Sequence, residues 1–559
     1  MRKFLISAAF FAAISFSYAQ EDKDLATWYH KDFATTNVYG INTENAYRFL
    51  ESKGLKPQTV VVGVLDSGVQ VDHPGLIKNM WTNPGEIAGN GKDDDKNGYV
   101  DDIHGWNFQG GKDGDVDVDN MEVTRVVKKY RPIFEGENSA QNKANQGKMP
   151  TEFAMYMKAK DIFQRKSIEA RRNYEYYKAL QERVPAIVAT LNGMTLTQEN
   201  LAKIQPKDAY QAQYRDMLSN LLRDPSLAGK TPAEVEAFLS KQMKGALDYF
   251  EPQATKQYDL DFDPRGIVGD NYDDVNERFY GNNHYEGPDA QHGTHVAGII
   301  AGYPHDGNIQ YGVASRVAKI MTVRAVPDGD ERDKDVANAI RYAVDNGAKV
   351  LNMSFGKPIS PNKDKVWEAF KYAQDKGVLL VKAAGNENED IVENEYFPTN
   401  YKSVNDKQPF VTNMIVVGAS TKDNDGLRAG FSNFNSERVD LFAPGAEIYS
   451  TVPKNEYEYL QGTSMASPVV AGAAAVLFAY MPQLTPQQVK EALMKTVNRP
   501  AAQPGQEVPF TSYSASGGVI DLYKAAQYAY NNFYQNKTTK PVLRKTATPS
   551  KGARRVLAK

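Results

Sequence analysis

The sequence predicts an α/β domain built on a largely parallel sheet, and two alternating patterns support this fold class. Short runs rich in Val, Ile and Leu, bounded by Gly, Asn or Asp, occur at 59–65, 350–354, 378–382 and 414–417. Such uninterrupted apolar runs are typical of parallel strands that are buried on both faces. Amphipathic helical stretches at 333–346 and 365–376 lie between them, each ending at or next to a glycine. This alternation indicates right-handed crossovers around one buried sheet.

The composition of the chain excludes several functional classes. Its 559 residues are 41% hydrophobic and 24% charged, which is typical of a folded protein. The formal net charge of −3 provides no field that would attract nucleic acid, so we expect no nucleic-acid partner. Cysteine is absent, which excludes disulfides, thiolate zinc sites and cysteine nucleophiles. Any catalytic nucleophile must therefore be an oxygen or a lysine nitrogen.

The first residues have the pattern of a secretory signal peptide, which we expect to span 1–19. Arg2 and Lys3 precede an apolar run at 4–16, and small residues surround a cleavage point between Ala19 and Gln20. The run is too short for a membrane-spanning helix, and we expect no transmembrane anchor. The mature protein is then expected to be exported, to the periplasm or the extracellular space. The alternative interpretation is a buried N-terminal helix.

The remaining chain is expected to form one main domain with flanking segments. We expect a short leader at 20–37, a domain at 38–530 and a basic, disordered tail at 531–559. That tail contains eight Lys and Arg residues, no acid, and many Thr, Pro and Ala residues. A basic anchor to an anionic cell surface is the alternative interpretation of the tail.

The region 116–264 predicts a helical insertion that interrupts the domain. It is rich in Lys, Glu, Gln, Tyr and Met and poor in strand patterns. Thr231 and Glu234 form the pattern of a capping box with Pro at the first helical position, followed by a 3.6-residue apolar period. Two roles stay open for the insertion. It forms a lid or wall that restricts substrate access, or it packs away from the active site.

Three residues that can build a nucleophilic site each stand at the end or the start of a predicted element. Asp66 ends the first apolar run, where ligand crevices of α/β sheets form. His292 begins a helix of small and apolar residues, and Ser464 follows a glycine at the start of another. A serine attacks once a histidine takes its proton, and an aspartate orients that histidine and stabilises the imidazolium. Taken singly, Asp66 is also consistent with a turn cap and Ser464 with a helix cap.

A side-chain amide follows a third strand pattern. Asn386 comes after Ala383-Ala384-Gly385, at the end of the apolar run 378–382. An asparagine in this position can donate a hydrogen bond to the oxyanion of a tetrahedral intermediate.

These four motifs resemble those of the subtilisin-like serine proteases, the subtilases. The resemblance rests on a strand ending in Asp66-Ser-Gly, on His292-Gly-Thr-His-Val-Ala-Gly, on Ala-Ala-Gly-Asn386 and on Gly-Thr-Ser464-Met-Ala-Ser-Pro. It covers about 38–115 and 265–530. It implies a three-layer α/β fold with a mostly parallel sheet of about seven strands. It also implies a serine endopeptidase with Asp66, His292 and Ser464 as catalytic triad and Asn386 in the oxyanion hole.

The resemblance further implies how a substrate is held. In subtilases the peptide pairs with two strand edges that flank the primary pocket, and the matching residues here are Ser354, Phe355, Gly356, Ala383, Ala384 and Gly385. The expected partners are protein or peptide substrates, and the chemistry requires no cofactor. Two alternatives stay open. They are a catalytically inactive subtilase-fold binding module, and a peptide ligase or esterase that uses the same triad.

An acidic segment predicts a structural calcium ion. Asp93, Asp95 and Asn97 alternate before Gly98, as in the first half of a calcium loop, and Asp101 or Asp102 could replace the missing glutamate of such a loop. An acidic turn without metal is the alternative. The acids between 259 and 274 are expected to form a solvated loop.

Overall fold

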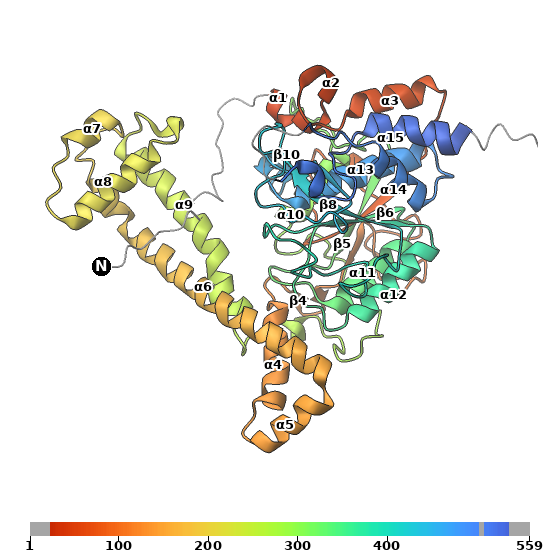
Figure 1. The fold of residues 1–559 in the computed structure, drawn as a ribbon, viewed down its shortest axis with the longest axis horizontal. Coiled ribbons are helices and arrows are strands. Elements are labelled where there is room, and N and C mark those ends of the chain that lie inside the picture. Colours follow the sequence, from red (N-terminus) through yellow and green to blue (C-terminus); the bar gives the residue numbers. More distant parts are fainter. Residues whose placement is uncertain (1–22, 502–507, 536–559) are drawn as a thin grey trace, which may run out of the picture.

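The computed structural model describes residues 23–501 and 508–535, and its central sheet confirms the predicted α/β fold (Figure 1). Seven strands, each parallel to its neighbours, lie in the order β2-β5-β1-β6-β7-β8-β9. The strands are β1 Val60–Asp66, β2 Gly105–Asn107, β5 Ala318–Arg324, β6 Val350–Met353, β7 Leu379–Ala383, β8 Met414–Ser420 and β9 Leu441–Pro444. The predicted signal peptide, and the predicted tail from residue 536 onward, lie outside the described residues.

Helices cover both faces of the sheet and give the domain three layers. One hydrophobic core joins alternate strand residues such as Val62 and Val381 to Val470. The helices on that side are α3 Thr43–Ser52, α10 Gln291–Ala301, α13 Thr463–Tyr480, α14 Pro486–Lys495 and α15 Leu522–Ala529. A second core joins the opposite strand face to Ile340 and Phe370 on α11 Asp333–Asp345 and α12 Lys363–Asp375. The continuous apolar runs of the sequence therefore face apolar helices on both sides.

Helix α13 runs through the middle of the domain. Small residues allow it to approach its neighbours closely, and a Cβ built on Gly472 would lie 2.8 Å from the Cβ of Val313. Within the described part of the chain, α13 is the one helix long and apolar enough to cross a membrane, and 94% of it is buried inside the protein. That burial is typical of a core helix.

Short elements complete the domain. The N-terminal helices α1 Lys23–Ala26 and α2 Phe33–Thr36 pack on it, since Trp28 and Tyr29 between them are buried in the first core. Two hairpins, β3 Gly110–Gly111 with β4 Gly114–Asp115 and β10 Ile448–Val452 with β11 Glu456–Leu460, are antiparallel. Single turns of 3₁₀ or π helix occupy Trp28–His30, Ile77–Asn79, Pro225–Leu227, Gln253–Gln257, Arg265–Ile267, Phe510–Ser512 and Tyr530–Tyr534.

The region predicted as an insertion contains six helices and no strand among its described residues from 122 to 252. They are α4 Glu122–Phe134, α5 Ser139–Lys148, α6 Pro150–Ala189, α7 Gln198–Lys203, α8 Ala209–Leu221 and α9 Pro232–Pro252. Figure 1 shows α6 and α9 side by side as an arm that leaves the sheet domain and carries α7 and α8 at its far end. The capping box predicted at Thr231 and Glu234 is present at the start of α9.

The arm has two small hydrophobic cores of its own. The core at its base joins α4 to the start of α6 and includes Val126, Phe134 and Tyr156. The core at its far end joins the second half of α6 to α9 and includes Val184, Leu218 and Leu239. We call these two parts the arm base and the arm tip.

Candidate active site

The predicted site residues meet at one edge of the sheet. Because β1, β6 and β7 are parallel neighbours, their carboxyl ends lie together, and these ends are Asp66, Met353 and Ala383. Helices α10 and α13 begin at the same edge, with His292 as the second residue of one and Ser464 as the second residue of the other.

Asp66 and His292 form a close polar contact at this edge. Asp66 Oδ1 lies 2.6 Å from His292 Nδ1, and it also accepts a hydrogen bond of 2.8 Å from the backbone amide of Ser67. The Asp66 side chain is 3% exposed, whereas the His292 side chain is 39% exposed. The close approach requires the glycine after the histidine, since a Cβ at Gly293 would lie 2.0 Å from the carbonyl oxygen of Gly68. The ring is thus held on one side and open to solvent on the other.

The charge of Asp66 changes the protonation of His292. Burial alone would lower the pKa of the imidazole, because the charged ring loses contact with water. The Asp66 carboxylate opposes this effect through its charge and its hydrogen bond, and the pKa of His292 is raised above its ordinary value. The carboxylate therefore makes His292 a stronger base than an isolated imidazole.

Ser464 stands in the first turn of α13. Its hydroxyl donates a hydrogen bond of 3.2 Å to the carbonyl oxygen of Ser354, and the Ser354 hydroxyl donates one of 2.9 Å to the carbonyl oxygen of Ser464. These two bonds tie the start of α13 to the residue that follows β6. Ser464 is the one residue of α13 that is not buried.

Asn386 is oriented by the residue before Ser464. Its side-chain oxygen accepts hydrogen bonds of 2.9 Å from both the backbone amide and the hydroxyl of Thr463. The Thr463 hydroxyl also accepts a bond of 3.1 Å from the backbone amide of Gly385. Since the oxygen of Asn386 is engaged in this way, its amide nitrogen is the atom left to face a ligand beside Ser464.

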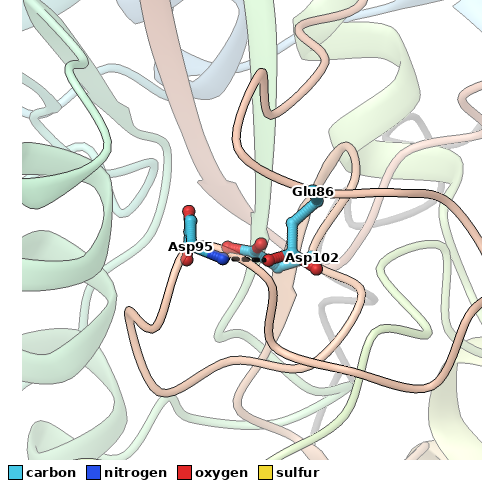
Figure 2. A group of neighbouring side chains, drawn as sticks. All are labelled: Glu86, Asp95 and Asp102. Carbon is cyan, nitrogen blue, oxygen red and sulfur yellow. Dashed lines mark hydrogen bonds between the residues drawn. The ribbon is translucent and has the colours of Figure 1, made fainter.

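The acidic segment gathers a different set of carboxylates from the set predicted. Carboxylate oxygens of Glu86, Asp95 and Asp102 lie within 4.8 Å of one another (Figure 2). Asp102 is fully buried, and burial raises its pKa to about 6 against the hydrogen bonds that it accepts. Glu86 stands outside the alternating pattern, which is why the sequence did not reveal it.

The other predicted ligands have different partners. The oxygens of Asp93 accept from the backbone amides of Asn97 and Gly98, and those of Asp101 accept from the amides of Asn90 and Gly91. Asn97 itself directs its amide group toward Asp95 and Asp102. The structure therefore brings together Asp95, Asn97 and Asp102 of the predicted segment, and it turns Asp93 and Asp101 toward backbone.

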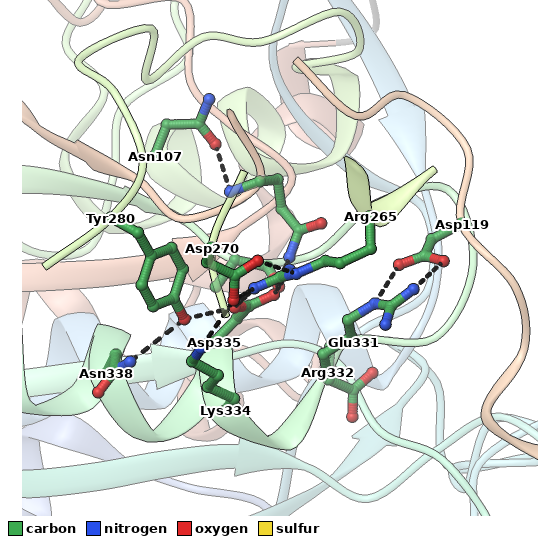
Figure 3. Close-up of polar contacts among 12 residues, drawn as sticks. Asn107, Asp119, Arg265, Asp270, Tyr280, Glu331, Arg332, Lys334, Asp335 and Asn338 are labelled. Atoms are coloured by element: carbon green, nitrogen blue, oxygen red, sulfur yellow. Dashed lines mark hydrogen bonds and ion pairs between the residues drawn. The ribbon is translucent and has the colours of Figure 1, made fainter. Parts of the chain in front are cut away.

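Buried ion pairs fix both ends of the arm to the start of α11, as Figure 3 shows. Before the arm, Asp119 pairs with Arg332 at 2.6 Å. After the arm, Arg265 contacts Asp270 and Asp335, both at 2.7 Å. The expectation of a solvated acidic loop is wrong for Asp270, whose side chain is 0% exposed.

A third buried cation connects the arm base to the site. Lys357 directly follows the predicted pocket residue Gly356 and is 1% exposed. Its ammonium lies 2.7 Å from Glu122 on α4 and 2.8 Å from Asp333 on α11. Burial would lower the pKa of Lys357, but the charges of Asp333 and Glu122 outweigh it and raise that pKa. We call the pairs of Arg265, Arg332 and Lys357 the junction.

Comparison with known proteins gives this arrangement a family. The family model described as the Subtilase family matches residues 58–547. The chain is 36% identical to subtilisin DY of Bacillus licheniformis over 42% of this chain and 77% of that protein. It is 35% identical to thermitase of Thermoactinomyces vulgaris over 42% of this chain and 75% of that protein.

A larger relative matches over a smaller share of its length. The cell wall-associated protease of Bacillus subtilis is 33% identical over 45% of this chain, and the match spans 25% of that protein. The family match covers most of the chain on both sides of the arm, and the predicted family and fold class are confirmed. The chain belongs to the subtilase family of serine endopeptidases.

Proposed function

We propose that this protein hydrolyses peptide bonds through Asp66, His292 and Ser464, with Asn386 stabilising the oxyanion. The observation that carries the proposal is the 2.6 Å contact between His292 and Asp66, at the sheet edge where α13 presents Ser464 as its one accessible residue. Its substrates are proteins or peptides. The chemistry needs no metal or cofactor, because base, nucleophile and oxyanion donor all come from this chain.

In the first half of the reaction, Ser464 Oγ attacks the carbonyl carbon of the scissile bond. His292 Nε2 takes the hydroxyl proton, while Nδ1–H stays bonded to Asp66 and the carboxylate stabilises the imidazolium. To reach His292, the Ser464 hydroxyl leaves the carbonyl of Ser354 and rotates about its Cα–Cβ bond when substrate binds. The oxyanion then accepts hydrogen bonds from the Asn386 amide and from backbone N–H at the start of α13.

In the second half, the intermediate collapses and the C–N bond breaks. His292 gives its proton to the leaving amine, and the acyl group remains on Ser464. Water then attacks the ester, with His292 again as base. Proton return to Ser464 releases the new carboxylate and restores the starting state.

The direct test is the Ser464→Ala substitution. Peptide hydrolysis should fall by about 10⁶-fold, a loss measured when the serine is removed from a subtilisin, because the triad acts as a unit. The melting temperature should change little, since Ser464 is the one residue of α13 outside the core. A peptide can also be offered together with a competing amine. The masses of the products then distinguish hydrolysis, which gives a free carboxylate, from ligation, which gives an amide with the added amine. Wild-type protein that cleaves nothing would instead favour the inactive binding module.

We further propose that Glu86, Asp95 and Asp102 hold a structural calcium ion. Hard carboxylate oxygens suit this cation, and three of them converge around a fully buried aspartate. Asn83 Nδ2 lies between two of them, 3.0 Å from Asp95 and 2.7 Å from Asp102, and its partial positive charge offsets part of their repulsion. A bound cation would offset the remaining repulsion between the carboxylates.

Chelation should therefore lower the melting temperature, since an ion that binds the folded state stabilises it. Glu86→Gln and Asp95→Ala should abolish that sensitivity. Asp93→Ala is the matched control, because its carboxylate contacts backbone amides and should leave the sensitivity in place. An identical melting temperature with and without chelator would leave an acidic turn without metal.

The domain boundaries and the export of the chain are also proposals. We propose that 1–19 is removed on export to the periplasm or the extracellular space. We also propose that the basic tail predicted at 531–559 begins only after Gln535, because Phe533 and Tyr534 pack against the first core. Within that domain, the arm acts on substrates that are large enough to touch it. Its base lies against the pocket segment through Lys357, whereas its tip projects away from the sheet (Figure 1).

A further inference from the structure

The two predicted pocket segments both contact the start of α13. Ser354 exchanges two hydrogen bonds with Ser464, and the backbone amide of Gly385 donates to Thr463. The space between the two segments therefore lies directly beside the proposed nucleophile. A substrate side chain next to the cleaved bond would have to enter there.

The ring of Tyr396 occupies that space. A Cβ built on Gly356 would lie 2.4 Å from Tyr396 Cε1, and a Cβ built on Gly385 would lie 3.0 Å from the same atom. Both values are shorter than the separation of about 3.5–4.0 Å between carbons in contact. One edge of the ring thus touches both pocket walls, and the two glycines make its entry possible.

Contacts on both sides hold the ring in place. Phe397, the next residue, exchanges backbone hydrogen bonds of 2.9 and 2.8 Å with Lys357, the residue after Gly356. Lys382 places its ammonium 4.7 Å from the centre of the Tyr396 ring, within the range of a cation–π interaction. Lys382 is the residue of β7 immediately before Ala383 and is 2% exposed. The ring is therefore anchored to both pocket walls rather than lying in a free loop.

We propose that Tyr396 fills the primary pocket and limits the substrate residue before the cleaved bond to glycine, alanine or serine. The inference rests on the proposed function, and it names the substrate class of that site. A larger side chain would overlap the ring edge between Gly356 and Gly385. Displacing the ring would in turn break its contact with Lys382. Pocket size selects substrates by about 10–200-fold for a single methylene, so the effect is measurable.

The test compares kcat/KM for two peptides that differ only in alanine or phenylalanine before the cleaved bond. Wild-type protein should prefer alanine by about 100-fold or more. Tyr396→Ala should raise kcat/KM for the phenylalanine peptide by about 10-fold or more. Tyr396→Phe should keep the wild-type ratio, because the ring remains. Tyr401→Ala is the matched loop control, since its ring packs on Arg438 and not between the glycines.

Wild-type protein that cleaves both peptides at equal rates would overturn the inference, because the ring would then move aside at no cost. This comparison needs no variant and holds even if Tyr396→Ala fails to fold. Covalent labelling of Ser464 by a fluorophosphonate tests the nucleophile separately from the pocket. If Ser464 is labelled but the protein does not prefer the alanine peptide, the role of Tyr396 is overturned and the proposed function stands. No labelling and no cleavage of either peptide overturns the proposed function and the inference with it.

Discussion

The sheet domain and the helical arm are built on opposite designs. In α13 every residue except Ser464 is buried, and the helix packs on the sheet through small side chains. In α6 seven of 40 residues are buried, and the other 33 are partly or fully exposed. A reacting atom must be held to within a fraction of an ångström, so the proposed chemistry stands on the rigid element. The arm tip contains none of the proposed site residues, so it carries no such requirement.

The junction makes this comparison testable, because it is where the two designs meet. Its cations are buried, and together they have carboxylate partners from both regions. The ion pairs between residues 161 and 248 of the arm have side chains that are 35–81% exposed. A buried pair that loses one partner leaves an uncompensated charge, and an exposed pair loses almost nothing. Stability should therefore respond to substitutions at the junction and not to those along the arm.

The largest expected effect on stability comes from Lys357→Met, which leaves Asp333 buried without its cation and leaves Glu122 paired with Arg125 alone. We expect a loss of about 3–5 kcal/mol in the free energy of unfolding. The matched control is Lys244→Met on α9, where the pair with Asp248 is exposed and contributes about 0.3–0.5 kcal/mol. Urea unfolding of both variants measures the difference. Equal losses of unfolding free energy in the two variants would show that the junction pairs contribute no more to stability than the exposed pairs of the arm.

The next effect is the pH dependence of catalysis, which should depend on the sheet domain alone. His292 must be neutral to accept a proton, and its pKa is raised above 6.5. Activity should therefore fall as pH drops through a midpoint above 6.5, by about tenfold for each further pH unit. Asp66→Asn removes the charge that raises this pKa, so the midpoint of the residual activity should move to lower pH. A pH–rate profile of kcat/KM that stays flat down to about pH 4 would exclude His292 as the base.

The smallest expected effect follows removal of the arm tip. The rings of Tyr177 and Phe250 stack at 5.3 Å, so α6 and α9 are neighbours there and 176–250 can be replaced by a short Gly/Ser linker. This deletion removes the tip core and keeps the junction. A lid predicts several-fold faster cleavage of folded proteins and no change for small peptides. Equal changes for both substrate classes, or none, would contradict gating and leave a bundle packed away from the site.

Features that depend on a few neighbouring residues could be predicted from the sequence, whereas contacts between distant residues could not. Asp66, His292, Asn386 and Ser464 are each recognisable within a few residues of a strand or helix terminus. Four of the seven strands, β1, β6, β7 and β8, were visible as continuous apolar runs. The pair of Asp119 and Arg332 joins residues 213 positions apart, and no local pattern marks either one. Such pairs exist only because the arm enters and leaves the domain beside α11.

Two further features could not be predicted, because each depends on residues that no single local pattern includes. The role proposed for Tyr396 depends on a ring that meets two glycines from different strand ends, and its position in a polar loop gives no sign of this. The acidic cluster recruits Glu86 from outside the alternating pattern, while Asp93 and Asp101 serve their own turns. Composition predicted that carboxylates gather there, and only the folded chain shows which ones face each other.

The position of a fluorophosphonate label, found by mass spectrometry of the full chain, shows which residue is the nucleophile. The reagent mimics the tetrahedral intermediate and reacts only with a serine that a base has activated. We predict one label, on Ser464, in wild-type protein and in the protein without its arm tip. His292→Ala should lose it although Ser464 is still present. A label on another residue, or one that persists in His292→Ala, would contradict the assignment of nucleophile and base.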